Sequence, residues 1–402
     1  MITRFSTLYV GHIELERCGL AGTPADSRRY SNRRLMETFD TAIALAQATD
    51  ALGYETLWLA EHHFQHEGYE CIPNIPLLAV DLAHRTERVR IGCAFNIVPT
   101  WHPLRLAEDF ATADILTGGR VVFGVGRGYH SREVETFGNP MLDAEANREL
   151  FEEQVELILK AFDQESFAHR GKHYTIPPDV PYRGYRLGEI TLVPRPRRRP
   201  VEVWQPIVSG SARSLDFMAR HGIKGVVSAT AEQFVDRWFR DYQEAARRHG
   251  RALALGQDLI LGFRMCLDDT VERAMDRARP YFEEHAKFMA PLGMLRYSEE
   301  HVKAVAARQA QSPTGATLDN GVRNRSWLCG PPGDIVAYLK EVEARYPGLE
   351  HVMIAWALGT PRELMLEQLT RFAREVMPAF LPAPGRAASP DFARGSAPSP
   401  PP

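Results

Sequence analysis

Short apolar segments alternate with longer segments of helical periodicity along most of the chain. Such alternation predicts parallel strands connected by helices, in a sheet that is buried on both faces. The predicted strands cover residues 4–10, 55–60, 89–98, 120–126, 201–208, 222–228, 257–266 and 351–357. The predicted helices cover residues 33–52, 75–86, 103–117, 143–165, 211–221, 231–249, 270–290 and 361–378.

Eight strand–helix units favour a (β/α)₈ TIM barrel over a doubly wound sheet, and we expect one domain over residues 1–382. Three segments fall outside the eightfold pattern and are predicted insertions: 11–32 after the first strand, 166–200 after the fourth and 291–345 after the seventh. The tail 383–402 is rich in Pro, Ala, Ser and Gly and is expected to be disordered.

The second and third insertions contain weaker signals of regular structure. Short strands are expected at about 172–176 and 189–193, before a run of proline and arginine. The third insertion is expected to combine a helix near 299–310, a polar stretch over 311–324 and a helix from about Gly333. Long irregular loops at the C-terminal face of a barrel commonly act as lids or binding loops.

Composition narrows the class of protein. The chain has 402 residues, a formal net charge of −3 and no basic patch, so neither nucleic acid nor an anionic membrane is an expected partner. Its five cysteines are widely spaced and form no Cys-x-x-Cys pair, which indicates reduced thiols. There is no apolar signal-peptide core and no run of about 18 apolar residues. We therefore expect a soluble cytoplasmic protein.

Glu61, His62 and His63 directly follow the apolar strand 55–60. Polar groups at the end of a buried strand cost folding free energy unless they are hydrogen-bonded or take part in chemistry. The sequence therefore favours a catalytic cluster. A solvated loop start in which one histidine caps the next element is the structural alternative.

Other chemically informative residues follow neighbouring strands, and in a barrel these strand ends meet at one site. Glycines at 124, 126 and 128 would let a flat ring approach the backbone, while Arg127 offers a planar fork to a phosphate. The segment is not a dinucleotide fingerprint, because Tyr129 stands where the third glycine is required. The remaining candidates at strand ends are Phe95, Asn96, Ser209, Gly210 and Ser211.

Ser209, Gly210 and Ser211 precede a predicted helix and resemble a phosphate cup, although an ordinary serine N-cap fits the same pattern equally well. Arg148 could supply a second cation or be a solvated helix residue. His62 and His66 are spaced like zinc ligands, but a third ligand is not evident, so no metal is expected.

Several stretches together resemble the bacterial luciferase-like flavin-dependent monooxygenases. The resemblance extends in order from about residue 3 to residue 380. It is carried by residues 53–64, 99–109, 118–128, 135–138 and 376–378.

The resemblance implies a dimeric TIM-barrel subunit that acts on an organic substrate. It would use reduced FMN from a separate flavin reductase and form a flavin hydroperoxide with O₂. His62 is similar to the family's catalytic base, with Glu61 and His63 supporting it. Arg127, Arg148 and Ser211 resemble its phosphate-binding residues.

The resemblance also places the flavin ring against particular residues. The bond between Ala94 and Phe95 falls where the luciferase large subunit has a non-proline cis peptide beneath the ring. The full set of expected cofactor-binding residues is Ala94, Phe95, Asn96, Gly126, Arg127, Arg148, Ser209, Gly210 and Ser211.

This sequence departs from the luciferase large subunit at four positions. Gly126 replaces a reactive cysteine, Phe95 is larger than expected, Gly210 replaces a glutamate and His130 replaces a tyrosine. We therefore do not expect light emission. Residues 291–330 correspond to the family's mobile lid.

Three alternative functions remain at this point. One is a deazaflavin-dependent hydride-transfer enzyme of the same superfamily. Another is a metal-dependent barrel hydrolase that uses His62, His63 and His66. The third is a non-catalytic subunit, which the presence of His62, Arg127 and Ser211 disfavours.

Overall fold

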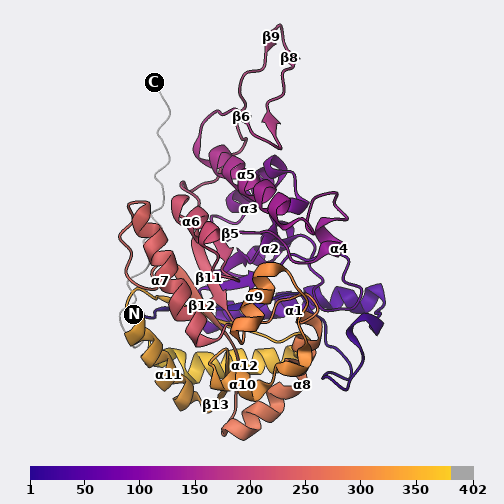
Figure 1. Ribbon diagram of the computed structural model, residues 1–402, viewed down its shortest axis with the longest axis vertical. Helices are drawn as coiled ribbons and strands as arrows, with labels where there is room; N and C mark the ends of the chain where they lie inside the picture. The colour runs from indigo at the N-terminus through magenta and orange to yellow at the C-terminus, as the bar shows by residue number, and fades with distance from the viewer. Residues whose placement is uncertain (382–402) are drawn as a thin grey trace.

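The computed structural model describes residues 1–381, and the predicted tail lies outside the described residues. Eight parallel strands close into a barrel, because the first strand pairs with the last and the fourth pairs with the fifth. The predicted TIM barrel is therefore confirmed (Figure 1). Its strands are β1 (Arg4–Tyr9), β2 (Thr56–Leu59), β3 (Arg90–Cys93), β5 (Val121–Gly126), β10 (Val203–Pro206), β11 (Lys224–Ser228), β12 (Leu259–Leu267) and β14 (His351–Ala355).

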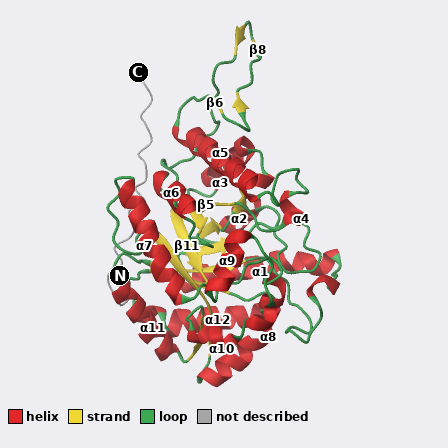
Figure 2. Ribbon diagram, in the orientation of Figure 1, coloured by secondary structure: helices red, strands yellow, loops and turns green. Residues whose placement is uncertain are grey.

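Helices surround the strands, as Figure 2 shows in red and yellow. Local sequence explains where several of them begin and end. Ser31 caps the N-terminus of the first helix and Gly53 ends it in the left-handed conformation, while His102 caps the third helix ahead of Pro103. The eight predicted helices correspond to α1 (Asn32–Leu52), α2 (Ile75–His84), α3 (Pro103–Leu116), α5 (Ala144–Asp163), α6 (Ala212–Arg220), α7 (Glu232–Arg248), α8 (Val271–Met289) and α12 (Arg362–Glu375).

The third predicted strand, 89–98, is interrupted. It divides into β3 and β4 (Asn96–Ile97), and the peptide between Ala94 and Phe95 is cis, as the resemblance implies. Both short strands pair with β5, so the chain resumes its course along the same neighbour after the break.

The third insertion contains more structure than the sequence predicts. The expected helices are present as α9 (Glu299–Ala307) and α11 (Pro332–Arg345). The stretch expected to be only polar also contains α10 (Leu318–Arg323), which Thr317 caps. An unpredicted strand, β13 (Trp327–Gly330), pairs with β12 outside the barrel. Both elements are too short for periodicity to reveal them.

The second insertion forms two small hairpins that project beyond α5 (Figure 1). The strand expected at 172–176 is confirmed in β7, but the one expected at 189–193 is wrong, because only Ile190 forms a bridge, to Phe167. Pro194, which directly follows, has no N–H to extend the ladder. The hairpin strands are β6 (His169–Arg170), β7 (Thr175–Ile176), β8 (Pro181–Tyr182) and β9 (Tyr185–Arg186).

This insertion leads from the end of α5 into the first residue of β10. It therefore belongs to the N-terminal end of the barrel, opposite the strand ends that carry the candidate site. The first insertion follows β1 and therefore lies on the side of the site. The third begins after α8, and its Arg308 donates to Asn147 in the first turn of α5, so it also reaches that side.

Apolar side chains fill the interior of the barrel. Gly92 makes room for the ring of Trp58, because a Cβ there would overlap it. Side chains alternate along a strand, so Gly262 and Arg264 face the same side as Ile260. The interior cluster consists of Trp58, Ala94, Val122, Trp204, Val226, Ile260 and Met353, with Leu8 and Phe95 packed against it.

We predict that Gly124→Ala destabilises the barrel mouth. A Cβ at this position would overlap the carbonyl oxygen of Cys93 and lie 2.9 Å from Cδ1 of Phe95. Overpacking of this kind typically costs about 2 kcal/mol of unfolding free energy, which urea denaturation measures. Gly188→Ala is the control, since no atom lies within 4 Å of a Cβ there. Equal losses in the two variants would contradict this account of the packing.

Candidate functional site

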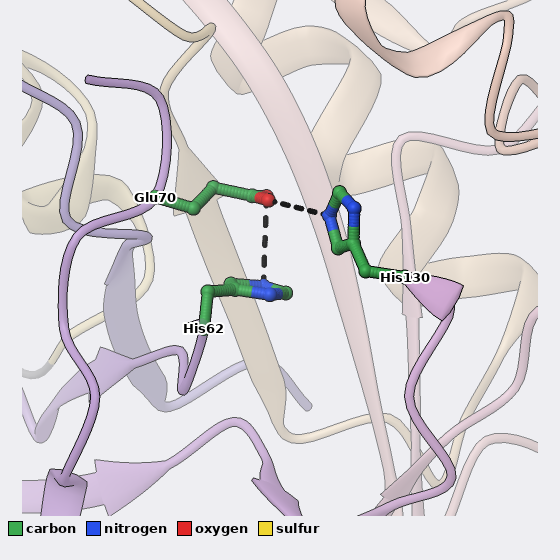
Figure 3. Close-up of side chains that lie close together, drawn as sticks. All are labelled: His62, Glu70 and His130. Carbon is green, nitrogen blue, oxygen red and sulfur yellow. Dashed lines mark hydrogen bonds and ion pairs between the residues drawn. The ribbon is translucent and has the colours of Figure 1, made fainter. Parts of the chain in front are cut away.

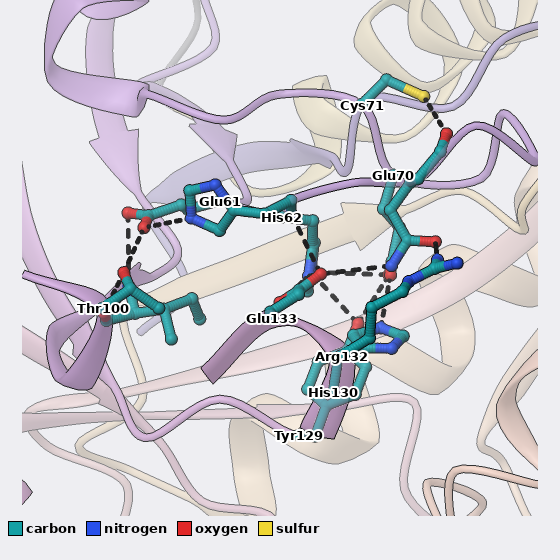
Figure 4. A network of polar contacts seen from close by, with 12 residues as sticks. Glu61, His62, Glu70, Cys71, Thr100, Tyr129, His130, Arg132 and Glu133 are labelled. Carbon is teal, nitrogen blue, oxygen red and sulfur yellow. Dashed lines mark hydrogen bonds and ion pairs between the residues drawn. The ribbon is translucent and has the colours of Figure 1, made fainter. Parts of the chain in front are cut away.

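A buried histidine–carboxylate network occupies the mouth of the barrel at the ends of β2 and β5. His62 Nδ1 lies 3.2 and 3.3 Å from the two carboxylate oxygens of Glu133. Its Nε2 lies 3.1 Å from the hydroxyl of Tyr129 and 3.5 Å from Glu70 Oε1. Figure 4 shows these side chains converging from separate loops. One imidazole therefore faces two carboxylates.

Glu70 links the loop after β2 to the loop after β5. Its carboxylate accepts hydrogen bonds from the Tyr129 hydroxyl at 2.6 Å and from His130 Nε2 at 2.9 Å. Figure 3 shows Glu70 between the rings of His62 and His130. Glu133 lies in the short helix α4 (Ser131–Val134) and is fully buried.

The two carboxylates determine the charge of His62. Burial alone would lower its pKa, but the charges of Glu70 and Glu133 outweigh burial and raise the pKa to about 9. For Glu133, burial opposes ionisation, but His62 and its hydrogen bonds lower the pKa to about 2. The resting site therefore holds an imidazolium at neutral pH. The resemblance implies a base at this position, whereas the surrounding charges favour a proton donor.

The side chains of Glu61 and His63 pair with each other beside the His62 network, and the backbone N–H of His63 donates to Glu133 at 3.0 Å. The buried Glu61 carboxylate accepts hydrogen bonds from His63 Nε2 at 2.9 Å, Trp101 Nε1 at 2.8 Å and Thr100 Oγ1 at 3.1 Å. These contacts fix the turn that precedes α3. Neither side chain hydrogen-bonds to the ring of His62, although the negative charge of Glu61 helps to raise its pKa.

Sequence reasoning missed the groups that contact His62 directly. Glu133 stands two residues before the quoted motif 135–138, and Glu70 lies in an irregular loop. Neither follows a strand or a periodic pattern, so their proximity to His62 becomes visible only in the folded chain.

The three histidines of the hydrolase alternative do not share a site. His63 bonds to Glu61, and His66 lies at the surface, 3.5 Å from Glu67. Among the described residues, a different group, His62, Glu70 and His130, places one ligand atom each within 4.8 Å of the others. These atoms already hydrogen-bond to one another and to Tyr129, and a protonated His62 repels a cation. The geometry therefore favours a proton network over a metal centre.

A group of arginines lies where the sequence predicts a phosphate site. Arg127 follows β5, Arg148 lies in α5 and Arg308 follows α9 in the third insertion. The Nη1 atom of Arg127 is buried without a hydrogen-bond partner in the described chain. Arg308 Nη2 donates to Asn147 Oδ1 at 2.7 Å, while the Asn147 amide donates to the carbonyl of Arg127 at 3.4 Å.

These cations repel one another. Burial, followed by the charges of Arg148 and Arg308, lowers the pKa of Arg127 to about 9. Within residues 1–381, Arg148 has neither an ion pair nor a hydrogen bond to relieve this repulsion. A partly buried cluster of cations without an ion pair is the electrostatic arrangement expected of an anion-binding site. Arg308 was not predicted from the sequence, because no motif marks it.

The small-residue turn before α6 has the predicted helix-opening role. The Ser211 side chain caps α6 and accepts a hydrogen bond from the Ser214 amide at 3.4 Å. Gly210 has φ +61°, and a Cβ there would overlap the indole of Trp238, so the turn requires glycine. The turn from Ser209 to Ser211 is partly exposed.

The predicted ring-binding residues line the interior side of the mouth. Phe95 is packed against the interior cluster with Ala94. The Asn96 amide donates to the carbonyl of Gly124 at 2.8 Å, which ties β4 to β5. A Cβ on Gly126 would lie 3.1 Å from Phe95 Cβ, so the glycine keeps this surface flat.

The sequence of this (β/α)₈ barrel is similar to those of known flavin-dependent monooxygenases. The sequence model of the luciferase-like monooxygenase family matches residues 19–348, and the chain belongs to that family. It is 25% identical to the oxygenase component of flavin-dependent trigonelline monooxygenase from Acinetobacter baylyi, over 86% of this chain and 90% of that protein.

Other matches are shorter or more distant. The chain matches 38% and 44% of the lengths of two uncharacterized Sinorhizobium fredii proteins, at 34% and 32% identity. The oxygenating constituent of 3,6-diketocamphane monooxygenase from Pseudomonas putida, solved with FMN, has the same fold, with a TM-score of 0.72 at 19% identity. The structural match covers 95% of this chain and 100% of the other.

We predict that Glu133→Gln lowers the pKa of His62 from about 9 towards its ordinary value of 6.5, because it removes one of the two facing charges. The pH titration of the His62 ring by ¹⁵N NMR measures this change. Since the folded-state pKa is raised, the stabilisation from this network is full below pH 6.5 and declines as the pH rises through about 9.

Glu299→Gln, which removes an exposed carboxylate paired with Arg237 at 3.2 Å, is the control and should leave the titration of His62 unchanged. An unchanged His62 titration in Glu133→Gln would show that Glu133 does not control its charge.

Proposed function

We propose that the protein is the oxygenase component of a two-component flavin monooxygenase. It would take reduced FMN from a separate flavin reductase, together with O₂, and oxygenate an organic substrate. The named activity of the trigonelline monooxygenase relative supports this reading. The observation that carries it is the buried, unpartnered Nη1 of Arg127 among other cations.

A phosphate group fits this cluster in charge and in donor geometry. Arg127 and Arg148 would bind its oxygens, and the hydroxyl of Ser211 and the first amides of α6 would add donors. Ala94, Phe95, Asn96 and Gly126 would support the ring, with Ser209 and Gly210 forming the turn beside the phosphate. Reduced FMN, when bound, would supply the electrons for the activation of O₂.

The role of the protein side chains follows from their charge. His62 holds a proton on a ring clamped by Glu133, and Tyr129 connects that ring to Glu70. His62 would donate this proton to a reacting oxygen and recover it through the Tyr129–Glu70 link. The insertion 291–330 would exclude water from the mouth.

The fold alone does not distinguish an FMN-dependent enzyme from a deazaflavin-dependent one. An F420-dependent secondary alcohol dehydrogenase also has this fold, with a TM-score of 0.64 at 15% identity. The protonated histidine network favours oxygen chemistry, since an imidazolium can protonate a reduced oxygen, whereas hydride transfer from an alcohol requires a base to take up the released proton.

We also propose a cytoplasmic homodimer. Leu77 on α2 and Leu116 on α3 are 71% and 56% exposed on adjacent helices, and burial of such residues would favour association. All five cysteines lie in the described chain as free thiols, which suits a reducing compartment. No helix of the described chain is long and apolar enough to cross a membrane.

Anaerobic titration with reduced FMN and with reduced deazaflavin tests the cofactor. We expect reduced FMN to bind more tightly. With a flavin reductase and ¹⁸O₂, an oxidised product should then carry one ¹⁸O atom. Binding and turnover with deazaflavin alone would reject the proposal.

We predict that Arg127→Gln weakens FMN binding about 10- to 100-fold, the equivalent of one or two charge-assisted hydrogen bonds. Riboflavin, which lacks the phosphate, should bind both proteins equally. Equilibrium titration of flavin fluorescence measures both ligands. Arg240→Gln on α7, which removes an exposed arginine paired with Asp236 at 2.8 Å, is the control. An equal loss of riboflavin affinity in Arg127→Gln would mean that Arg127 does not act on the phosphate.

A further inference from the structure

Two arginines at the barrel mouth lie apart from the phosphate cluster. Arg264 lies near the C-terminal end of β12, four residues beyond Ile260 and on the same, interior side of the strand. Arg296 lies in the third insertion, between α8 and α9. Both side chains are partly buried. Arg296 Nη2 donates to the carbonyl of Ser228, which pairs with Gly262 on β12, so the fold brings the two arginines to the same part of the mouth.

Neither arginine forms an ion pair with a carboxylate within residues 1–381. Arg264 Nε donates to the carbonyl of Trp356 at 3.4 Å, and no described residue accepts a hydrogen bond from its Nη atoms. Arg296 donates to the carbonyls of Ser228 at 2.9 Å and Met294 at 3.1 Å. By contrast, the buried Arg28 in the first insertion pairs with Glu284 at 3.0 Å.

The charges around the pair remain uncompensated. Burial and the charge of Arg264 lower the pKa of Arg296 to about 10, and burial lowers that of Arg264. His285 on α8 faces both arginines. Burial, followed by their charges, lowers its pKa well below the usual range, and its Nδ1 is buried without a partner. Three nitrogen-bearing groups thus converge where no counter-charge is bonded to them.

Glu70 is the carboxylate whose charge acts on Arg264, because it partly offsets the fall in the pKa of that arginine. Its oxygens already accept from Tyr129 and His130 and face His62. Tyr129, which donates to Glu70, packs against the apolar cluster that contains Trp327, and the guanidinium of Arg264 lies over the Trp327 ring. The arginine pair therefore borders the His62 network, where the reacting group of a substrate would lie.

A pocket large enough for a small molecule lies beside the His62 network. An open pocket of about 490 Å³ lies between the first insertion and the end of α8, and His130 forms part of its wall. Arg132 and Lys287 also line it, opposite Asp26 and Glu67, so its lining carries equal numbers of basic and acidic side chains. The pocket itself therefore does not select between anions and cations, and a preference for an anion has to come from the arginine pair.

We propose that Arg264 and Arg296 bind the carboxylate group of an organic acid and that the substrate of this protein is therefore an anion. The inference rests on the proposed oxygenase function. It adds the substrate class and two specificity-determining residues. A bound carboxylate would accept from the free Nη atoms of Arg264, neutralise the repulsion between the two guanidinium groups and hold the rest of the acid beside His62.

A purely structural role for Arg264 makes a different prediction. Its guanidinium carbon lies 6.0 Å from the centre of the Trp327 ring, a contact that could simply hold β13 against β12. In that case its replacement would lower stability without changing which ligands bind. Charge selectivity in ligand binding therefore separates the two roles.

Isothermal titration of the FMN-loaded protein with matched acid and amide pairs tests the inference. The probes are benzoate with benzamide and octanoate with octanamide. We expect at least one acid to bind about tenfold more tightly than its amide, and Arg264→Met to reduce this ratio below about threefold. Arg264→Lys should retain part of the preference because it keeps the charge. Arg240→Met is the surface control and should match the unmodified protein.

The acid and amide titrations test the substrate inference, and FMN binding in the same samples tests the proposed function. Equal affinity for acids and amides, or no binding of either acid, would overturn the substrate inference, while retained FMN binding in the same samples would leave the proposed function standing. If Arg264→Met weakens only reduced FMN and keeps the acid preference, the flavin ring is the anion recognised by Arg264, and the inference is wrong. Failure of the unmodified protein to bind FMN at all would instead reject the proposed function.

Discussion

The burial of a protonated imidazole between two carboxylates is the constraint on which the site depends. His62, Glu133 and Glu70 are each nearly inaccessible to solvent, so none can carry charge there without the others. Because the three come from the loop after β2 and from the loop and short helix after β5, their pairing fixes those loops relative to the barrel. Glu61 supports the same edge separately, by binding the turn that leads into α3.

The rest of the barrel mouth carries an excess of positive charge. Arg127, Arg148 and Arg308 face one another on one side, and Arg264 with Arg296 on another, and none of these five arginines forms an ion pair within residues 1–381. Such groups destabilise the protein alone and become favourable when an anion binds. Two separate cation groups are what a phosphorylated cofactor and an acidic substrate would require. The third insertion supplies one arginine to each, so ligand binding and closure of this segment would be energetically coupled.

The sequence alone could predict the barrel because strands buried on both faces give clear apolar segments, and the intervening helices have strong periodicity and caps. It could also mark His62, Arg127 and Ser211 as candidates, since each lies just after a strand or at the start of a helix. It could not identify Glu70, Glu133 or Arg264 as partners of the site. Glu70 lies in an irregular loop, Glu133 in a four-residue helix and Arg264 within an apolar strand, so tertiary contacts alone reveal them. The short elements β13 and α10 were missed because four to six residues carry too little periodicity.

The central claim is that the unpartnered arginine beside β5 marks the binding site of a flavin phosphate. A crystal structure of the protein soaked with FMN tests it most directly. The account predicts phosphate oxygens within hydrogen-bonding distance of the guanidinium of Arg127 and the hydroxyl of Ser211, with the ring against Ala94 and Phe95. A flavin phosphate bound away from Arg127, or a ring outside the barrel mouth, would contradict it.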